Sequence, residues 1–149
     1  ITFAEKVFLK LYCYIKLPMI AYCRPKICNL TNCNAVVRIP LRRKTKNHFN
    51  SMYFGALSVG ADFTAGLLVM KILKKHKSNA RLLFKDFRAD FKKRATSDVL
   101  FLCSDYNIIE SSVLKNLKDR DRINFELKVR AVSEDKEHIA DFILTTSIK

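Results

Sequence analysis

The chain has 149 residues, with 28 Lys and Arg against 14 Asp and Glu, so its formal net charge at pH 7 is +14. Hydrophobic residues make up 49% of it, and it has no repeats and no runs rich in Gly, Pro or Ser, which excludes disordered, collagen-like and solenoid proteins. This length suits one domain with a sizeable core, so we expect a single domain over residues 1–149.

The positive charge predicts attraction to anions: nucleic acid, acidic lipids, or phosphate-bearing small molecules such as coenzyme A. The five cysteines are odd in number and lack a C-x-x-C spacing, which favours neither a disulfide framework nor a zinc site. We interpret them as reduced thiols in a cytoplasmic protein. The three histidines have no metal-site spacing either, so we predict no metal.

The first predicted element is an amphipathic helix over Thr2–Leu17, within an N-terminal helical segment, residues 1–24. Phe3, Val7, Leu11 and Tyr14 recur at helical spacing, and Pro18 ends the pattern. The apolar face needs a partner. We favour packing on the domain's own sheet; contact with a membrane surface is the alternative, because lysines flank the apolar residues.

Two short strands follow, Lys26–Leu30 and Ala35–Leu41, joined by a turn at residues 31–34; Pro40 places the second at an edge or ends it. From Tyr53 to Leu73 the only formal charges are Asp62 and Lys71. We interpret Tyr53–Lys74 as a core helix rather than a membrane span, because a central carboxylate costs roughly 2.5–3.5 kcal/mol in a bilayer.

In the second half of the chain, apolar residues recur at every second position. Alternation predicts a half-buried strand over Phe87–Ala95, and the apolar run Val99–Cys103 predicts a strand buried on both faces. Residues 110–121 read as a polar connection with one helical turn, and alternation resumes over 123–130 and 140–144. The predicted class is α+β, with a curved antiparallel sheet of about six strands wrapped round the central helix.

All three glycines of the chain lie in that helix, within twelve residues. At 100° per residue one stripe holds Gly55, Val59, Asp62, Gly66, Val69 and Leu73, while Gly60 faces away, towards the sheet. Asp62 is an acid on an apolar stripe, where desolvation raises the pKa. We interpret it as a candidate general base or nucleophile; the alternative is a structural Asp bonded to a backbone amide or a lysine.

The start of the same helix offers a second feature. We expect Asn50 or Ser51 to cap it, which leaves the first-turn amides near Phe54 and Gly55 free to hold an oxyanion; an ordinary capped helix is the alternative.

The stretch Pro40–Asp62, PLRRKTKNHFNSMYFGALSVGAD, resembles the start of the central helix in hotdog-fold thioesterases, especially the DUF4442 branch, which is related to the PaaI-like thioesterases. In the PaaI-like pattern an Asn is followed six residues later by His-Gly-Gly, and an acid lies nine residues beyond that His. Asn47, Tyr53, Phe54, Gly55 and Asp62 occupy these places. Tyr53 and Phe54 depart from the His and the first Gly, and Tyr-Phe-Gly-Ala is similar to the form usual in DUF4442.

The resemblance implies an acyl-CoA or acyl-carrier-protein thioesterase with no cofactor. In that reading Asp62 activates water or attacks the thioester, the Gly55 amide polarises its carbonyl, and Asn47 positions water or the acyl group. Tyr53 and Phe54 border the substrate, and the basic residues Lys92, Lys93 and Arg94 hold coenzyme A phosphates; Lys74, Lys75 and Lys77 are the other candidates. The resemblance also implies a homodimer or a dimer of dimers.

Two other function classes stay open. A non-catalytic acyl- or lipid-binding protein would keep the fold without hydrolysis, and the charge permits nucleic-acid binding. Because the sequence carries no recognised nucleic-acid motif, we expect no nucleic-acid partner.

Overall fold

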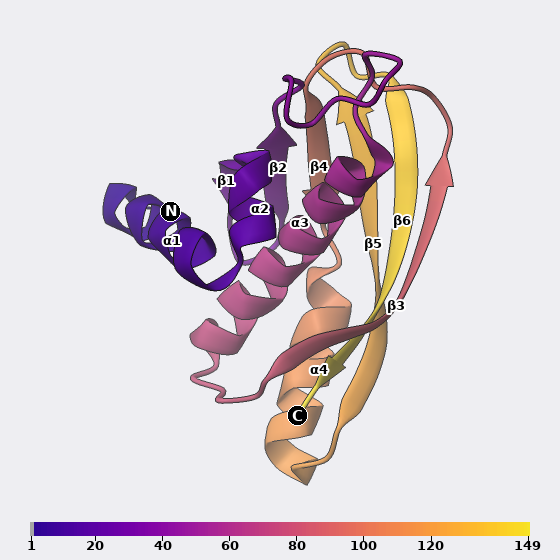
Figure 1. Ribbon diagram of the computed structural model, residues 1–149. Coiled ribbons are helices and arrows are strands. Elements are labelled where there is room, and N and C mark those ends of the chain that lie inside the picture. The colour runs from indigo at the N-terminus through magenta and orange to yellow at the C-terminus, as the bar shows by residue number, and fades with distance from the viewer. Residues whose placement is uncertain (1) are drawn as a thin grey trace.

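The computed structural model describes residues 2–149, which form four helices and one six-stranded antiparallel sheet. The helices are α1 (Phe3–Lys16), α2 (Pro18–Cys23), α3 (Phe54–Lys75) and α4 (Tyr106–Asp119). The strands are β1 (Lys26–Leu30), β2 (Ala35–Ile39), β3 (Leu82–Phe91), β4 (Val99–Cys103), β5 (Ile123–Ser133) and β6 (His138–Ile148). Their order across the sheet is β1-β2-β4-β5-β6-β3. Figure 1 shows this sheet curving round α3, so the predicted architecture is confirmed.

The core lies between α3 and the concave face of the sheet. Leu57, Ala61, Leu68 and Ile72 of α3 are buried against strand residues that include Phe101. Among the described residues α3 is the one helix long and apolar enough to span a membrane, and 67% of its most apolar stretch is buried inside the protein. That is the packing of a core helix, as the sequence predicts.

Gly60 permits the closest contact in this core. A Cβ at residue 60 would lie 2.3 Å from Cε2 of Phe101, whose side chain is fully buried. The predicted role of Gly60, close packing on the sheet, is therefore confirmed. Gly66 differs, because a Cβ there would lie 3.9 Å from Leu82 and Phe84, an ordinary contact distance.

The prediction that α1 packs on the sheet is wrong, because α1 packs mainly against α2. Thr2 and Glu5 form a capping box at its start, with Thr2 Oγ1 accepting from the Glu5 amide at 3.2 Å. Pro18 ends the helical pattern as expected, and it occupies the first turn of α2. Figure 1 shows α1 and α2 beside α3, away from β3, β5 and β6.

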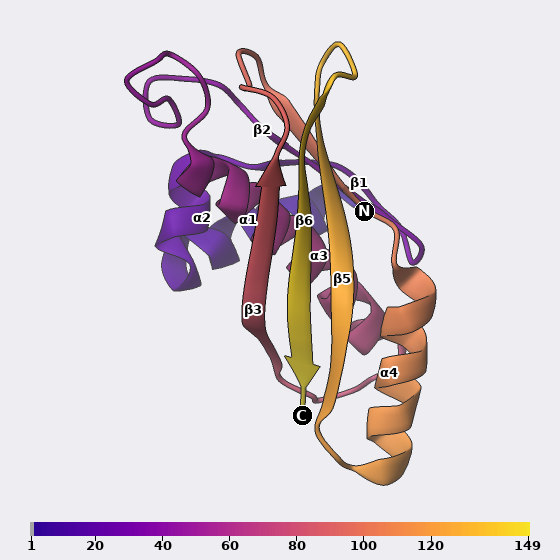
Figure 2. The same ribbon diagram turned by 90° about the vertical axis from the view of Figure 1, so that its right-hand side faces the viewer.

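Strand β3 corrects another prediction. It spans Leu82–Phe91 rather than Phe87–Ala95, and it pairs with β6 at the sheet edge rather than with β4, its neighbour in sequence. Most of its side chains are exposed on both faces, so it is not half-buried. The reason is that α3 covers the inner face of β3 only in part, near Phe84 and, through the Phe54 ring, at Phe91, while Figure 2 shows no helix in front of its outer face.

Two further predictions are wrong. Val99–Cys103 is buried on one face only, because Leu100 and Leu102 project from the outer face of the sheet, which lacks a covering layer there. The connection predicted at residues 110–121 is instead the 14-residue helix α4. Its Glu110 carboxylate accepts from Lys75 Nζ at 2.6 Å and contacts His76 Nε2 at 2.8 Å, which ties α4 to the end of α3.

Candidate functional site

The predicted stripe of α3 is partly exposed towards its N-terminal end and buried towards its C-terminal end. Gly55, Val59, Asp62 and Gly66 are partly exposed, whereas Val69 and Leu73 are buried. The partly exposed half faces the side of β3, since the nearest side chains to a Cβ at Gly66 are Leu82 and Phe84. The stripe therefore forms one wall of a site, with Asp62 near its middle.

The carboxylate of Asp62 has no hydrogen-bond or ion-pair partner among the described residues. The Asp62 side chain is partly exposed. Burial raises the pKa of Asp62 above 3.8, and no opposing charge offsets this shift. The alternative of a structural Asp held by a backbone amide or a lysine is therefore not supported. A partly buried carboxylate with a raised pKa can accept a proton from a reacting group.

The start of α3 differs in one detail from the prediction. The N-cap is Tyr53, with φ −63° and ψ 137°, and no side chain caps the helix; Asn50 and Ser51 lie further upstream in the loop. Ala56 N and Leu57 N donate to the Tyr53 carbonyl, at 2.9 and 3.1 Å. The amides of Phe54 and Gly55 have no acceptor among the described residues. They are thus free to donate to an anionic oxygen, as expected.

Aromatic rings border these two amides. The Tyr53 ring lies over Gly55, where a Cβ would be 2.5 Å from its Cε1, so glycine at residue 55 makes room for this ring. The Phe54 ring packs 4.8 Å from Tyr53 and meets Phe91 of β3 edge-on, with centroids 6.4 Å apart. Phe91 in turn packs edge-on against the buried Phe142 at 6.0 Å. The rings connect the start of α3 with β3 and form an apolar border that acyl or aromatic groups can contact.

Asn47 lies in the loop before α3, and its side chain is used there. Its Oδ1 accepts from the amides of Phe49 at 2.9 Å and Ser51 at 3.2 Å, and its Nδ2 donates to Ser51 Oγ at 3.1 Å. The structure thus gives Asn47 a visible role in shaping the loop. It does not bring the Asn47 amide to Asp62.

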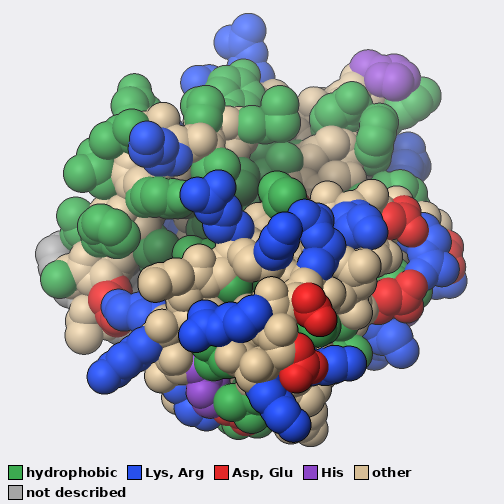
Figure 3. Space-filling view, turned by 90° about the horizontal axis from the view of Figure 1, so that it is seen from below, with side chains coloured by type: hydrophobic (Ala, Val, Ile, Leu, Met, Phe, Trp, Pro, Cys, Tyr) green, Lys and Arg blue, Asp and Glu red, His purple; other side chains and the backbone are tan. Residues whose placement is uncertain are grey.

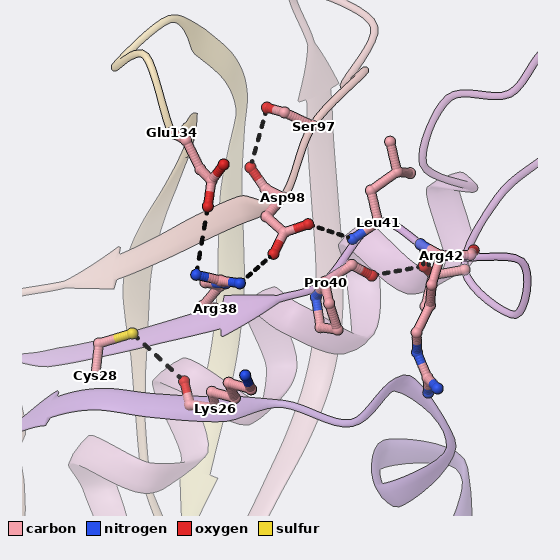
Figure 4. A network of polar contacts seen from close by, with 10 residues as sticks. Lys26, Cys28, Arg38, Pro40, Leu41, Arg42, Ser97, Asp98 and Glu134 are labelled. Carbon is pink, nitrogen blue, oxygen red and sulfur yellow. Dashed lines mark hydrogen bonds and ion pairs between the residues drawn. The ribbon is translucent and has the colours of Figure 1, made fainter.

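Two residues that the sequence analysis did not single out fix this loop. Asp98 pairs with Arg38 of β2 at 2.6 Å and accepts from the Leu41 amide at 2.8 Å, as Figure 4 shows. Thr45 is buried; its hydroxyl contacts the Pro40 carbonyl at 2.7 Å and the Arg42 amide at 3.0 Å. The sequence shows only a Thr between Lys44 and Lys46, which does not indicate this role.

Thr45 also holds the cap of α3, because its carbonyl accepts from the Tyr53 amide at 2.8 Å. Arg42 in turn donates from Nη2 to the Tyr22 carbonyl of α2 at 2.6 Å. The loop is therefore anchored on β2, on Asp98 just before β4 and on α2, and these contacts determine where Tyr53 and Gly55 lie.

Lys92, Lys93 and Arg94 follow β3 and are exposed. Lys92 pairs with Asp90, and Lys93 Nζ pairs with Glu137 at 2.5 Å. Arg94 has no ion-pair partner among the described residues. Just beyond it, the Ala95 carbonyl accepts from the Met52 amide at 2.8 Å. This bond places the basic segment alongside the loop that leads into α3.

A separate groove lies elsewhere on the molecule. It has a volume of about 820 Å³ and separates α1 and α2 from β1 and from Phe63 of α3. Asp62 is not among its lining residues. Asp62 lies instead on the partly exposed stripe of α3.

A curved antiparallel sheet wrapped round a long central helix defines the hotdog fold. Three solved structures share it with this chain. A candidate thioesterase from Shewanella oneidensis matches with a TM-score of 0.82 and 15% identity, over 95% of each chain. A probable thioesterase from Pseudomonas aeruginosa matches with a TM-score of 0.78 and 18% identity, over 96% of this chain and 95% of its own. A thioesterase from Haemophilus influenzae matches with a TM-score of 0.64 and 13% identity, over 95% of this chain and 87% of its own.

The sequence itself matches the family described as Domain of unknown function (DUF4442) over residues 4–147. The chain belongs to this family, as its Pro40–Asp62 segment predicts. No curated protein matches it.

Proposed function

We propose that this DUF4442 protein is a thioesterase that hydrolyses an acyl-CoA or an acyl-carrier-protein thioester, with Asp62 as general base or nucleophile. The observation that carries the proposal is the unpartnered, partly buried Asp62 carboxylate on the same stripe of α3 as the free first-turn amides. The names of the hotdog-fold relatives support the same reaction class.

The spacing along α3 suits a thioester. Gly55 and Asp62 are seven residues apart, about 10 Å along the axis, and helical side chains tilt back towards the N-terminus. That gap has room for a carbonyl group and one water. The carbonyl oxygen accepts from the Phe54 or Gly55 amide, and the helix dipole stabilises the charge that develops on it.

In the general-base route, Asp62 takes a proton from water while the water oxygen attacks the carbonyl carbon. The tetrahedral intermediate then expels the thiolate, which takes the proton back from Asp62. In the nucleophilic route the carboxylate attacks directly, the thiolate leaves, and water cleaves the resulting mixed anhydride. Neither route needs a cofactor, since coenzyme A enters as part of the substrate.

The remaining substrate contacts follow from the same surface. We infer that Arg94, with Lys92 and Lys93, holds the coenzyme A phosphates; all three side chains are exposed. Tyr53 and Phe54 border the acyl group, and Asn47 shapes the loop beside it.

We propose further that two copies associate through β3, as a dimer or a dimer of dimers. The outer edge of β3 is unpaired, and it exposes Leu83, Phe87 and Phe91. An exposed apolar edge strand favours pairing with a second chain, which would cover these residues and close the site at Asp62.

The reduced cysteines favour a cytoplasmic location.

The decisive experiment measures turnover of acyl-CoAs of different chain lengths by the wild type and by Asp62→Asn. Asp135→Asn is the matched control, because it makes the same change of charge at an exposed turn residue. We expect hydrolysis by the wild type and the control, and a loss of roughly 10²-fold or more in Asp62→Asn. Equal rates in the wild type and Asp62→Asn would exclude Asp62 from the mechanism.

Absence of turnover on every substrate, with lipid retained through purification, would favour the non-catalytic acyl-binding alternative. Salt-dependent retention of nucleic acid on a filter would favour the nucleic-acid alternative. A single turnover in ¹⁸O-water tests for the nucleophilic route. Label in the Asp62 carboxyl group would establish the nucleophilic route with water attacking the Asp62 carbonyl of the mixed anhydride, because the general-base route puts the label only in the product acid.

A further inference from the structure

Helix α1 turns its most apolar side away from the protein. Its outward residues Val7, Phe8, Leu11, Tyr14 and Ile15 are each between 49% and 75% exposed. On the opposite side Cys13 is buried and Leu9 is partly buried. In an ordinary surface helix the apolar side faces the core, so the orientation of α1 is reversed.

The exposed apolar surface continues onto α2. Leu17, Met19 and Tyr22 are exposed, whereas Ile20 and Cys23 point into the protein. We call the exposed apolar residues of α1 and α2 the N-terminal apolar patch. In Figure 3 hydrophobic side chains gather on the left, the side on which α1 lies in Figure 1, with Lys and Arg side chains among them. A contiguous patch of this kind marks an interaction surface.

The charges around the patch are almost all positive. Lys10 and Lys16 are exposed on the flanks of α1, and Arg24 and Lys26 follow α2. Glu5 is the only acidic residue in the sequence before Asp62, and it lies 3.8 Å from Lys74 of α3. The surface that would cover the patch must therefore be apolar where it meets α1 and anionic around it.

We propose that the N-terminal apolar patch docks on the surface of a lipid bilayer that contains anionic lipids. A helix with Phe, Leu, Ile and Tyr on one side and lysines at its flanks matches the boundary between acyl chains and headgroups. The tyrosines Tyr12, Tyr14 and Tyr22 suit the same boundary, because their rings are apolar and their hydroxyl groups remain hydrated.

The charge pattern favours lipid over a second copy of this chain. In a symmetric contact between two copies, each patch meets the same patch of the partner, and the two sets of Lys10, Lys16, Arg24 and Lys26 come together. Like charges then repel across the contact. Anionic headgroups instead attract each of these side chains, by on the order of 1 kcal/mol per residue near the surface.

Vesicle co-sedimentation of the full chain tests this proposal. The probes are vesicles of phosphatidylcholine alone and vesicles of phosphatidylcholine with phosphatidylserine. The variant L11S/I15S removes apolar side chains from the patch without changing the charge. I108S/L114S is its matched control, since Ile108 and Leu114 are exposed on α4, outside the patch. Thermal unfolding of each variant verifies the fold.

We expect the wild type to bind the phosphatidylserine vesicles more strongly, with binding that weakens as salt rises. L11S/I15S should lower the partition coefficient by about tenfold or more, and I108S/L114S should leave it unchanged. Lys10→Gln with Lys16→Gln should lower only the binding that depends on phosphatidylserine.

Three results would overturn the proposal: no sedimentation of the wild type with either vesicle, equal binding to both vesicles, or unchanged binding of L11S/I15S. Self-association that L11S/I15S abolishes, without vesicle binding, would assign the patch to a second copy. Because vesicle binding is measured without substrate, the outcome is independent of the proposed thioesterase activity.

Discussion

The ring of Phe101 lies against the backbone of Gly60 so closely that a Cβ there would be 2.3 Å from its Cε2 atom. Phe101 is fully buried and cannot move aside freely. We therefore expect Gly60→Ala to strain the core by about 1–3 kcal/mol, more than the roughly 1 kcal/mol that alanine gains in a helix. Urea denaturation should show a lower free energy of unfolding.

Gly66→Ala is the control in the same helix. A Cβ at residue 66 would lie 3.9 Å from Leu82 and Phe84, without strain. The variant should be as stable as the wild type or more stable, by up to about 1 kcal/mol. If both alanine variants shift stability equally, the contact of Gly60 with Phe101 has no special role.

The hydroxyl group of Thr45 supports the loop before α3, and Thr45→Val removes it with little change of shape. The Pro40 carbonyl and the Arg42 amide then lose a partner next to a buried side chain. Leaving such groups unpaired costs about 1–3 kcal/mol, which we expect as a lower free energy of unfolding in urea.

Thr64→Val provides the comparison for that prediction. Thr64 is also buried, but its hydroxyl donates to the Gly60 carbonyl, which already accepts from the Thr64 amide in α3. Valine there leaves no backbone group without a partner, so its effect should be the smaller. The reverse order of the two variants would contradict the role given to Thr45.

Glu110 links α4 to α3 in a manner that depends on pH. The hydrogen bonds from Lys75 and then His76 hold the pKa of Glu110 below 4.5, its ordinary value. An acid whose pKa is lowered by folding stabilises the fold above its unfolded pKa, and this contribution is lost as pH falls through the folded pKa. Glu110→Gln should therefore lower the Tm at neutral pH, with a difference that closes below pH 4.5.

Glu126→Gln is the matched control for Glu110→Gln. Glu126 pairs with Arg88 on the exposed surface, and pairs of this kind contribute little to stability. Its Tm should remain near that of the wild type at every pH. A Tm difference for Glu110→Gln that persists unchanged into acid would assign its effect to packing rather than to charge.

The sequence predicts α3 well because a long apolar run and the stripe that holds Gly55, Asp62 and Gly66 are properties of one helix. It does not predict that β3 pairs with β6, since pairing between distant strands leaves no local pattern. The prediction that Val99–Cys103 is buried on both faces is wrong for a related reason, because an apolar run does not reveal that one face of its strand lies at the surface. The helix α4 was missed because its apolar residues are few and interrupted by Ser, Asn and Lys.

The geometry around the candidate site is predictable from the sequence only in part. The stripe holding Gly55 and Asp62 follows from helix geometry, and the structure confirms that Asp62 is partly covered. The anchoring of the loop by Thr45 and Asp98 is not predictable, because it joins the end of β2, the residue before β4 and the loop, which meet only in the folded chain.

Asp62 without a partner should make the fold less stable at neutral pH. Burial raises its pKa above 3.8, so the folded chain binds the proton more tightly than the unfolded chain, and stability falls as pH rises through that range. Asp62→Asn should therefore raise the Tm at pH 7 relative to the wild type, with no difference below pH 3.8. Asp135→Asn, which makes the same change of charge at an exposed turn, should not. A lower Tm for Asp62→Asn at neutral pH would show that the carboxylate has a stabilising partner, which would contradict its assignment as a group held free for chemistry.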